Sequence, residues 1–451
     1  MARPSRISRI ADAAHLDSAV LWGLAGKIWS ASAGPITALI IAYVFSPEVQ
    51  GYHYTFLSLV ALQILLELGL SGVITTFASH EWARLGIGSE GRITGDPAAI
   101  SRLASIARLG IVWFGCCAIV LAIGLIIAGV YFFSASQPAV QLDWRGPWVM
   151  LSILSGAHLA ILPLWALLLG CNRVADVNRY RFSEAAIRSG AMWTAILLGA
   201  GLWTASISSL AALVWACAFL TIRYRTFLVS LLKAPMREKF GWKSEILPLQ
   251  WRIALSWISG YFMFFLFTPT LFHFQGPVVA GQMGMTWALI AGVSGLAGTW
   301  IQVKVPQFGM LVAKKDYAGL DRIVLRVGCI AFLIACTGGL VVVGIVAALD
   351  YYQHPLSSRL LPLGPVGIFA VAETLHQISI AQSSYLRAFK KEPFFLLGIG
   401  NGIMVGALTI IFAKYFGATG LAMAYLAGVI LALTWGSRIF VRCRRDWIGS
   451  T

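Results

Sequence analysis

Charged residues are scarce in this chain: Asp, Glu, Lys and Arg make up 12% of its 451 residues, whereas 59% are hydrophobic. Soluble domains ordinarily carry about 25% charged residues, so this shortage excludes a water-soluble domain. The apolar residues form blocks of roughly 20, the length of helix that crosses a hydrocarbon core about 30 Å thick. The sequence therefore predicts an all-α, polytopic membrane protein.

Paired cysteines and acidic residues are also few. The seven cysteines lie mostly within or beside apolar runs, without a C-x-x-C pair or a histidine at zinc-ligand spacing, so we expect no disulfide framework, metal or other cofactor. Only 18 acidic residues stand against 34 basic ones. Because the basic residues are spread through short loops rather than gathered in one patch, we attribute them to membrane topology and expect no nucleic-acid partner.

Twelve apolar stretches have the length and composition of membrane spans. Loops on the cytoplasmic side of a membrane retain positive charge. All but three of the 34 Lys and Arg residues fall on the side of the N-terminus, the exceptions being Arg145, Arg359 and Lys414. We therefore expect both termini in the cytoplasm. The predicted spans cover residues 20–46, 53–79, 106–133, 147–170, 184–204, 207–230, 252–274, 278–303, 323–349, 359–386, 393–414 and 417–440.

The longest polar break, Lys233–Gln250, divides six spans from six. It predicts an N-terminal six-helix bundle over residues 1–232, a linker over 233–250 and a C-terminal six-helix bundle over 251–451. Its basic and aromatic residues suit a segment at the cytoplasmic headgroup level, although a plain tether fits equally well. A short repeat supports two parallel halves, because Asp96, Ala98 and Arg102 recur in register as Asp316, Ala318 and Arg322.

Three stretches carry a family resemblance. They are Gly51–Ser71, which contains Glu67-Leu68-Gly69-Leu70, Pro306–Arg322 after the eighth span, and Tyr385–Phe394 before the eleventh. These stretches resemble the multidrug/oligosaccharidyl-lipid/polysaccharide exporter superfamily, in particular its O-antigen and polysaccharide flippase branch. The resemblance implies two bundles around a cavity that opens alternately to the cytoplasm and the periplasm.

The resemblance also implies a substrate, a location and partners. The substrate is an undecaprenyl-diphosphate-linked oligosaccharide, and the location is the bacterial cytoplasmic (inner) membrane. The implied partners are membrane lipids, a polysaccharide polymerase and chain-length proteins.

Ionisable side chains at membrane depth are the first candidates for a site, because each costs roughly 2.5–3.5 kcal/mol to insert. Lys27 and Arg252 lie in the cytoplasmic portions of the first and seventh spans and are predicted to bind the diphosphate. They serve equally well as topology anchors that reach the headgroups. Arg188 is a further substrate-binding candidate, but it follows Glu184 by four residues, the spacing of a structural ion pair.

Polar residues in three other spans complete the predicted site. Gln63, His158, His376 and Gln377 are candidates for binding the substrate, and Glu67 and Glu373 are candidates for ion coupling. Glu67 is also a candidate acceptor for sugar hydroxyls, and the histidines are also candidates for proton coupling. Glu373, His376 and Gln377 form a stripe at i, i+3 and i+4 in the tenth span. The alternatives are carboxylates that bond neighbouring helices and histidines that are satisfied structurally.

The function favoured by these residues is translocation of the lipid-linked sugar for surface polysaccharide synthesis, without covalent chemistry. A cation-coupled multidrug exporter of the same superfamily is the nearest alternative, but it favours a less basic cavity. A membrane glycosyltransferase, polymerase or ligase is a more distant alternative. Such an enzyme typically carries a D-x-D site or a long outward loop, and this sequence has neither.

Overall fold

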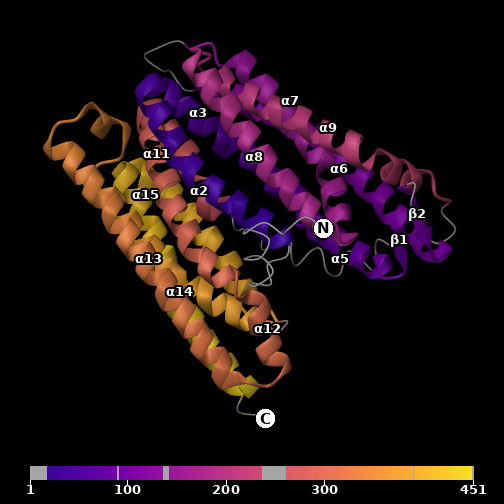
Figure 1. Cartoon of the computed structure of the whole chain (residues 1–451). Helices are drawn as coiled ribbons and strands as arrows, with labels where there is room; N and C mark the ends of the chain where they lie inside the picture. The colour runs from indigo at the N-terminus through magenta and orange to yellow at the C-terminus, as the bar shows by residue number, and fades with distance from the viewer. Residues whose placement is uncertain (1–17, 89–90, 136–141, 236–260, 390, 449–451) are drawn as a thin grey trace, which may run out of the picture. The chain divides into compact units, whose positions relative to one another are not determined.

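The computed structural model describes residues 18–88, 91–135, 142–235, 261–389 and 391–448, and these are almost entirely helical (Figure 1). The helices are α2 Ser18–Val44, α3 Pro47–Val60, η1 Ala61–Gln63, α4 Ile64–Glu67, α5 Leu70–Trp82, α6 Pro97–Ala135, α7 Arg145–Gly170, α8 Val174–Leu197, α9 Trp203–Lys233, α11 Phe267–Gln302, α12 Val305–Ala313, α13 Tyr317–Tyr351, η3 Pro355–Arg359, α14 Leu363–Arg387 and α15 Phe395–Ile448. One antiparallel hairpin, β1 Leu85–Ile87 and β2 Ile93–Gly95, joins α5 to α6.

The predicted number of twelve spans is confirmed when two divided helices are each counted as two and helix α8 is included. In the described part of the chain, nine helices are long and apolar enough to cross a membrane. Two of the nine are divided by a glycine with positive φ, Gly276 in α11 (85°) and Gly417 in α15 (58°), which a continuous right-handed helix does not allow. Helix α8 is less apolar but is 24 residues long. With each divided helix counted as two and α8 included, twelve membrane helices result. The seventh is described only from Tyr261.

Two predicted span boundaries are wrong. The fifth helix does not cover residues 184–204 but begins at Val174 and ends at Leu197. Hydropathy misses its polar first turns, and Gly199 (φ 75°) and Gly201 (φ 54°) terminate it early. The second predicted span, 53–79, is not one helix, because Leu68 (φ 50°) and Gly69 (φ 67°) interrupt it between α4 and α5.

The chain forms two compact units. Unit 1 contains the described residues of Met1–Thr37, Leu66–Val130 and Asp143–Ala254, and unit 2 those of Ala38–Leu65, Tyr131–Leu142 and Leu255–Thr451. The end of the first span, from Ala38, and the second span as far as Leu65 therefore belong to unit 2. The predicted linker and Arg252 fall largely or wholly outside the described residues.

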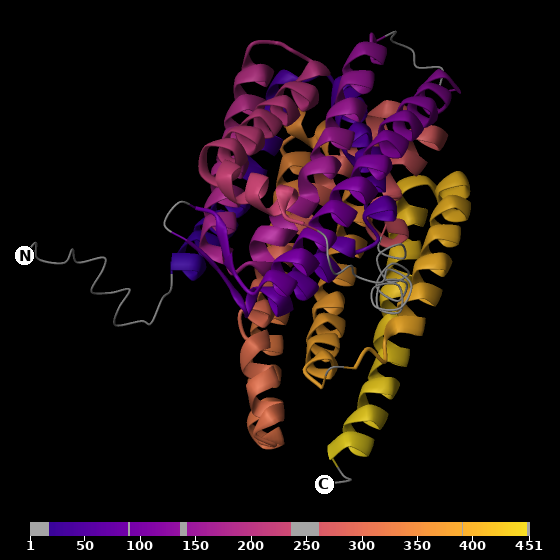
Figure 2. The same ribbon diagram turned by 90° about the vertical axis from the view of Figure 1, so that its right-hand side faces the viewer.

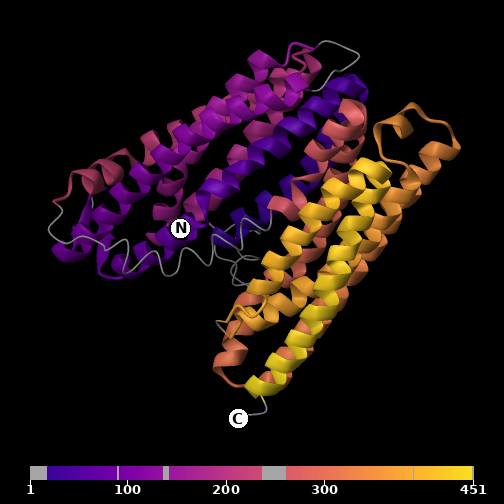
Figure 3. The ribbon, with the colours of Figure 1, turned by 180° about the vertical axis from the view of Figure 1, so that it is seen from behind.

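Unit 2 is organised around glycine-mediated helix contacts. Helix α3 crosses α11 so closely that a Cβ on Gly51 would lie 1.9 Å from the Pro277 carbonyl oxygen, and one on Gly284 would lie 2.3 Å from the Tyr54 Cβ. The two segments of α15 (yellow) run side by side, with Gly428 against Val405 (Figures 2 and 3). Small residues allow backbones to approach in this way, and membrane helices gain their packing energy from such contacts.

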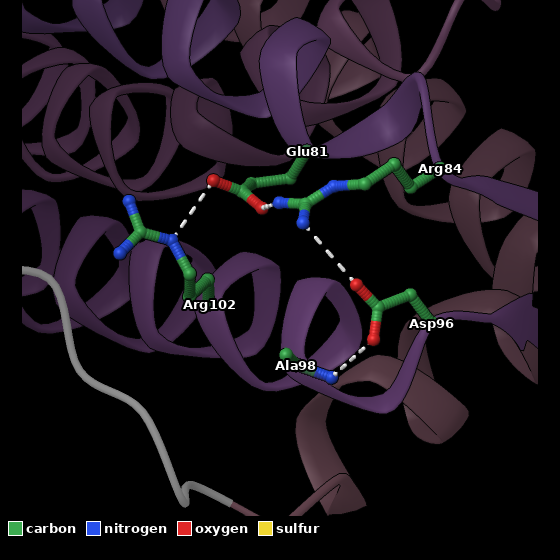
Figure 4. Close-up of polar contacts among 5 residues, drawn as sticks. All are labelled: Glu81, Arg84, Asp96, Ala98 and Arg102. Atoms are coloured by element: carbon green, nitrogen blue, oxygen red, sulfur yellow. Dashed lines mark hydrogen bonds and ion pairs between the residues drawn. The ribbon is translucent and has the colours of Figure 1, made fainter.

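In unit 1, a charged network joins the end of α5 to the start of α6 (Figure 4). The buried carboxylate of Glu81 lies 2.8 Å from Arg84 Nη2 and 2.9 Å from Arg102 Nε, and Arg84 in turn pairs with Asp96 at 3.2 Å. The Asp96 side chain also accepts from the Ala98 backbone amide at 3.0 Å. Its repeat counterpart in unit 2, Asp316, caps α13 by accepting from the Gly319 amide at 2.8 Å. Both copies of the repeat thus begin a spanning helix in the same manner.

Candidate functional site

In unit 1, helices α2 and α8 run parallel along a seam of aromatic and small residues. The Asn178 amide donates to the Ala19 carbonyl at 2.9 Å, and Phe182 lies against Gly26. Farther along both helices, Trp193 Nε1 donates to Thr37 Oγ1 at 2.8 Å. The increasing residue numbers at successive contacts fix the parallel direction and the register.

This register fixes where Lys27 lies relative to the Glu184–Arg188 pair. Lys27 follows Gly26 by one residue and Glu184 follows Phe182 by two, so the backbone of Lys27 lies level with that of Glu184, and Arg188 lies one turn farther along α8. The pair itself is confirmed: Arg188 Nη2 is 2.6 Å from Glu184 Oε1, with both side chains partly exposed. Lys27 is exposed on α2, within a helix whose composition suits a membrane span. The lysine on α2 and the ion pair on α8 therefore lie on neighbouring helices of unit 1.

His158 on α7 belongs to the same cluster. Its Nε2 lies 3.0 Å from the Ser209 carbonyl oxygen of α9, and the imidazole is close enough to interact electrostatically with both Glu184 and Arg188. The predicted residues His158 and Arg188 are thus brought together, and Lys27 lies on the adjacent helix α2 with its backbone level with that of Glu184. We call Lys27, His158, Glu184 and Arg188 the unit 1 charged cluster.

A second cluster lies within unit 2 around Glu373 of α14, which is 5% exposed. Its carboxylate accepts from the Ser294 hydroxyl at 2.5 Å and from the Tyr425 hydroxyl. Gln377 Nε2 donates to the same serine at 2.8 Å. His376 Nδ1 stands 3.7 Å from the carboxylate, too far for a hydrogen bond. The predicted stripe is therefore a buried network that connects α11, α14 and α15, and we call it the Glu373 cluster.

Aromatic rings enclose the Glu373 cluster. Phe264 stacks on His376 with ring centroids 5.9 Å apart, and Trp287 meets Tyr425 edge to face at 5.6 Å. Two acceptor or donor atoms inside this enclosure, Gln377 Oε1 and His376 Nδ1, are buried and make no hydrogen bond to any described residue. A buried polar atom without a partner is costly, so these two atoms are available to an ion or a polar ligand.

Glu67 and Gln63 belong to different units and occupy the interrupted second span. Glu67 is the last residue of α4 and accepts from the Ser71 hydroxyl across the break at Leu68 and Gly69. Gln63 ends the short 3₁₀ helix η1 and is partly buried. The sequence places Glu67 correctly in the second span but does not predict the backbone break beside it.

Sequence reasoning missed the partners of the predicted carboxylate. Ser294 and Tyr425 stand in apolar stretches, and only the rotation of their helices turns them toward Glu373. Sequence reasoning also missed a group around Asp321. The Asp321 carboxylate lies 2.5 Å from Arg444 Nη2 and accepts from the Tyr385 hydroxyl at 2.9 Å. This group lies at one end of an apolar groove of about 800 Å³ between α13, α14 and α15, which contains none of the predicted site residues. No group of three or more metal-ligating side chains occurs among the described residues.

No protein-family model and no curated protein matches the sequence. Solved structures match the fold. An inward-facing multidrug resistance MATE family transporter aligns over 96% of both chains at 17% identity and a TM-score of 0.61. The MATE multidrug transporter DinF-BH, solved in complex with R6G, aligns over 94% of both chains at 15% identity and 0.62. The lipid II flippase MurJ aligns at 13% identity and 0.66, over 94% of this chain and 89% of its own.

The chain has the fold of the multidrug/oligosaccharidyl-lipid/polysaccharide exporter superfamily. The family resemblance seen in the three sequence stretches is therefore confirmed at the level of fold. Two of these neighbours with the exporter fold are transporters and the third is a flippase, and none is an enzyme.

Proposed function

We propose that this protein is a flippase that moves an undecaprenyl-diphosphate-linked oligosaccharide across the bacterial cytoplasmic membrane by alternating access. The observation that carries the proposal is the presence of two cations on neighbouring membrane helices of unit 1: Arg188, paired with Glu184 on α8, and Lys27, exposed on α2. A diphosphate needs cationic partners once it leaves water, and hydrogen bonds to charged groups are the stronger ones. MurJ, a neighbour in fold, is a lipid II flippase.

Within this proposal the residues have distinct roles. Lys27 and Arg252 bind the diphosphate, and Arg188 adds a guanidinium that Glu184 holds in position. Gln63, His158, His376 and Gln377 bind sugar hydroxyls. Glu67 and Glu373 exchange a coupling ion. Membrane lipids surround the protein, both termini lie in the cytoplasm, and a polysaccharide polymerase and chain-length proteins receive the product.

Cation-coupled multidrug export is the second candidate function. Two observations favour it: several neighbours in fold are MATE transporters, and the Glu373 cluster combines a buried carboxylate with an aromatic enclosure. Such an enclosure suits an organic cation, because aromatic faces attract positive charge. The two functions differ in what the unit 1 charged cluster must do, since an anionic diphosphate needs Lys27 and a cationic drug does not.

The deciding experiment is polysaccharide export in cells that carry Lys27→Ala, Arg252→Ala or Arg188→Ala at matched protein levels. We expect Lys27→Ala and Arg252→Ala each to abolish or sharply reduce export, and the exchange Lys27→Arg with Arg252→Lys to retain more activity than either. Arg179→Gln is the matched control, because Arg179 is also on α8 but lies over the Trp22 ring. Wild-type export by both Lys27→Ala and Arg252→Ala would refute the flippase assignment. Drug efflux that survives in the same variants would favour the second function.

A further inference from the structure

The apolar groove of about 800 Å³ in unit 2 lies apart from the polar cluster already described in that unit. Helix α14 forms its floor, and α13 and α15, which both pack against α14, form its two walls. The floor residues Ala381 and Tyr385 are buried. The wall residues Leu325, Leu333 and Val441 are exposed. The groove therefore opens toward the medium that surrounds the helices.

The groove follows α13 for about the depth of one membrane leaflet. Its lining on that helix extends from Asp321 to Leu333, a rise of about 18 Å at about 1.5 Å per residue. Half of a hydrocarbon core about 30 Å thick is about 15 Å. Because α13 has the length and composition of a membrane span, lipid chains surround this part of it. One hydrocarbon chain of a single leaflet matches the length of the groove.

Three polar side chains from three helices close one end of the groove. Asp321 on α13 and Arg444 on α15 form an ion pair with Oδ2 and Nη2 2.5 Å apart, which joins the two walls. From the floor, the Tyr385 hydroxyl donates to Asp321 Oδ1 at 2.9 Å. Each of the three residues lies within two turns of an end of its helix. The ion pair is therefore placed where spanning helices reach the lipid headgroups.

This ion pair offers a charge of each sign to a ligand. The side chains of Asp321 and Arg444 are 34% and 48% exposed, so their mutual contact does not enclose either of them. A guanidinium carries five N–H donors, and two nitrogens of Arg444, Nε at 3.3 Å and Nη2, face Asp321. The remaining donors suit phosphate oxygens. A carboxylate has about four acceptor positions, so Asp321 can also accept from an ammonium group.

We propose that the groove binds a zwitterionic phospholipid whose headgroup carries a protonated primary amine, namely phosphatidylethanolamine. One acyl chain lies in the groove, the phosphate contacts Arg444 and the ammonium group donates to Asp321. A choline headgroup has no N–H to donate, and a glycerol headgroup has no positive charge, so the ion pair favours ethanolamine over both. The bound lipid links α13 to α15 across α14. This proposal does not depend on the substrate of the protein.

The headgroup is tested by native mass spectrometry of the purified full-length protein in detergent. The protein is titrated separately with phosphatidylethanolamine, phosphatidylcholine and phosphatidylglycerol that carry identical acyl chains. We expect phosphatidylethanolamine to bind about fivefold more tightly than either other lipid, because one partly exposed charged contact distinguishes them. Asp321→Asn should remove this preference. Arg444→Gln should weaken the binding of all three lipids about fivefold, whereas Arg444→Lys, which keeps the charge, should weaken it less.

The chain-binding part of the groove is tested by filling it. Cys329 lines the groove on α13 and is exposed, so Cys329→Trp should weaken the binding of all three lipids about fivefold by occupying the space of the acyl chain. Leu340→Trp is the matched control. Leu340 is also exposed on α13 but does not line the groove, so this change should leave lipid binding unaltered.

Two kinds of result would overturn the proposal. Equal binding of the three lipids, or a preference for phosphatidylglycerol, would contradict the headgroup assignment. Binding that is unchanged in Cys329→Trp, or that falls equally in Leu340→Trp, would show that the acyl chain does not lie in the groove. Thermal unfolding of each variant in detergent checks that the fold is retained.

Discussion

The Tyr425 hydroxyl donates a hydrogen bond to the Glu373 carboxylate and so ties the second segment of α15 to α14. If Glu373 carries the coupling ion, Glu373→Gln keeps the shape of the side chain but should abolish the dependence of transport on the ion gradient. Tyr425→Phe should retain that dependence, because the carboxylate remains and only one donor is lost. Transport in inverted membrane vesicles with imposed proton or sodium gradients measures both. Gradient-driven transport that persists in Glu373→Gln and in Glu67→Gln would make these residues structural.

The close crossing of α3 and α11 predicts opposite effects on stability when two different glycines of α11 are replaced by alanine. A methyl group at Gly284 would meet Tyr54 at 2.3 Å, whereas one at Gly292 would meet nothing within 4 Å. Gly284→Ala should therefore destabilise the protein by about 1–3 kcal/mol, as overpacking does. Gly292→Ala should be neutral or slightly stabilising, because alanine favours the helix. Thermal unfolding in detergent compares the two, and equal behaviour would contradict the close crossing.

The charge network of Figure 4 predicts a difference between a buried and an exposed carboxylate. Glu81 is 5% exposed in its side chain and pairs with both Arg84 and Arg102, while Glu392 is 60% exposed and pairs with Arg387 at 2.9 Å. Glu81→Ala should cost about 1–3 kcal/mol, because it removes a buried carboxylate that accepts from two guanidinium groups, one of them the partly buried Arg102. Glu392→Ala should cost about 0–1 kcal/mol. A smaller loss for Glu81→Ala than for Glu392→Ala would refute this ranking.

The distribution of basic residues predicts the side of the membrane on which each loop lies. Single cysteines introduced into a cysteine-free variant as Lys314→Cys and Tyr352→Cys lie on opposite ends of α13, and both native positions are exposed. A membrane-impermeant thiol reagent added to intact cells should label position 352 and leave position 314 unlabelled until the membrane is opened. The reverse pattern would invert the topology and with it the predicted location of both termini.

Sequence alone predicts much of the fold because membrane spans are read from length and hydropathy. It places Lys27, Glu67 and Glu373 on the correct spans, and the Glu184–Arg188 spacing correctly predicts an ion pair. Sequence-based prediction fails where the structure depends on backbone geometry or on the rotation of a helix about its axis. The break at Leu68 is such a case, because a leucine with positive φ carries no sequence signal. The bonds from Ser294 and Tyr425 to Glu373 are another, since they depend on how three helices distant in sequence are turned toward each other.

Leu68 has a left-handed backbone conformation, which raises the conformational energy of the second span. A residue with a Cβ in that conformation costs roughly 1–2 kcal/mol, and Gly69 beside it costs little. A continuous right-handed helix through this point would release that energy, so the broken and continuous forms differ by an amount comparable to one or two hydrogen bonds at Glu67. An ion or ligand that binds Glu67 in only one form would then shift the balance between the two populations. Leu68→Gly should favour the broken form, and hydrogen exchange of the amides of residues 68–72 should rise; unchanged exchange would exclude a second form.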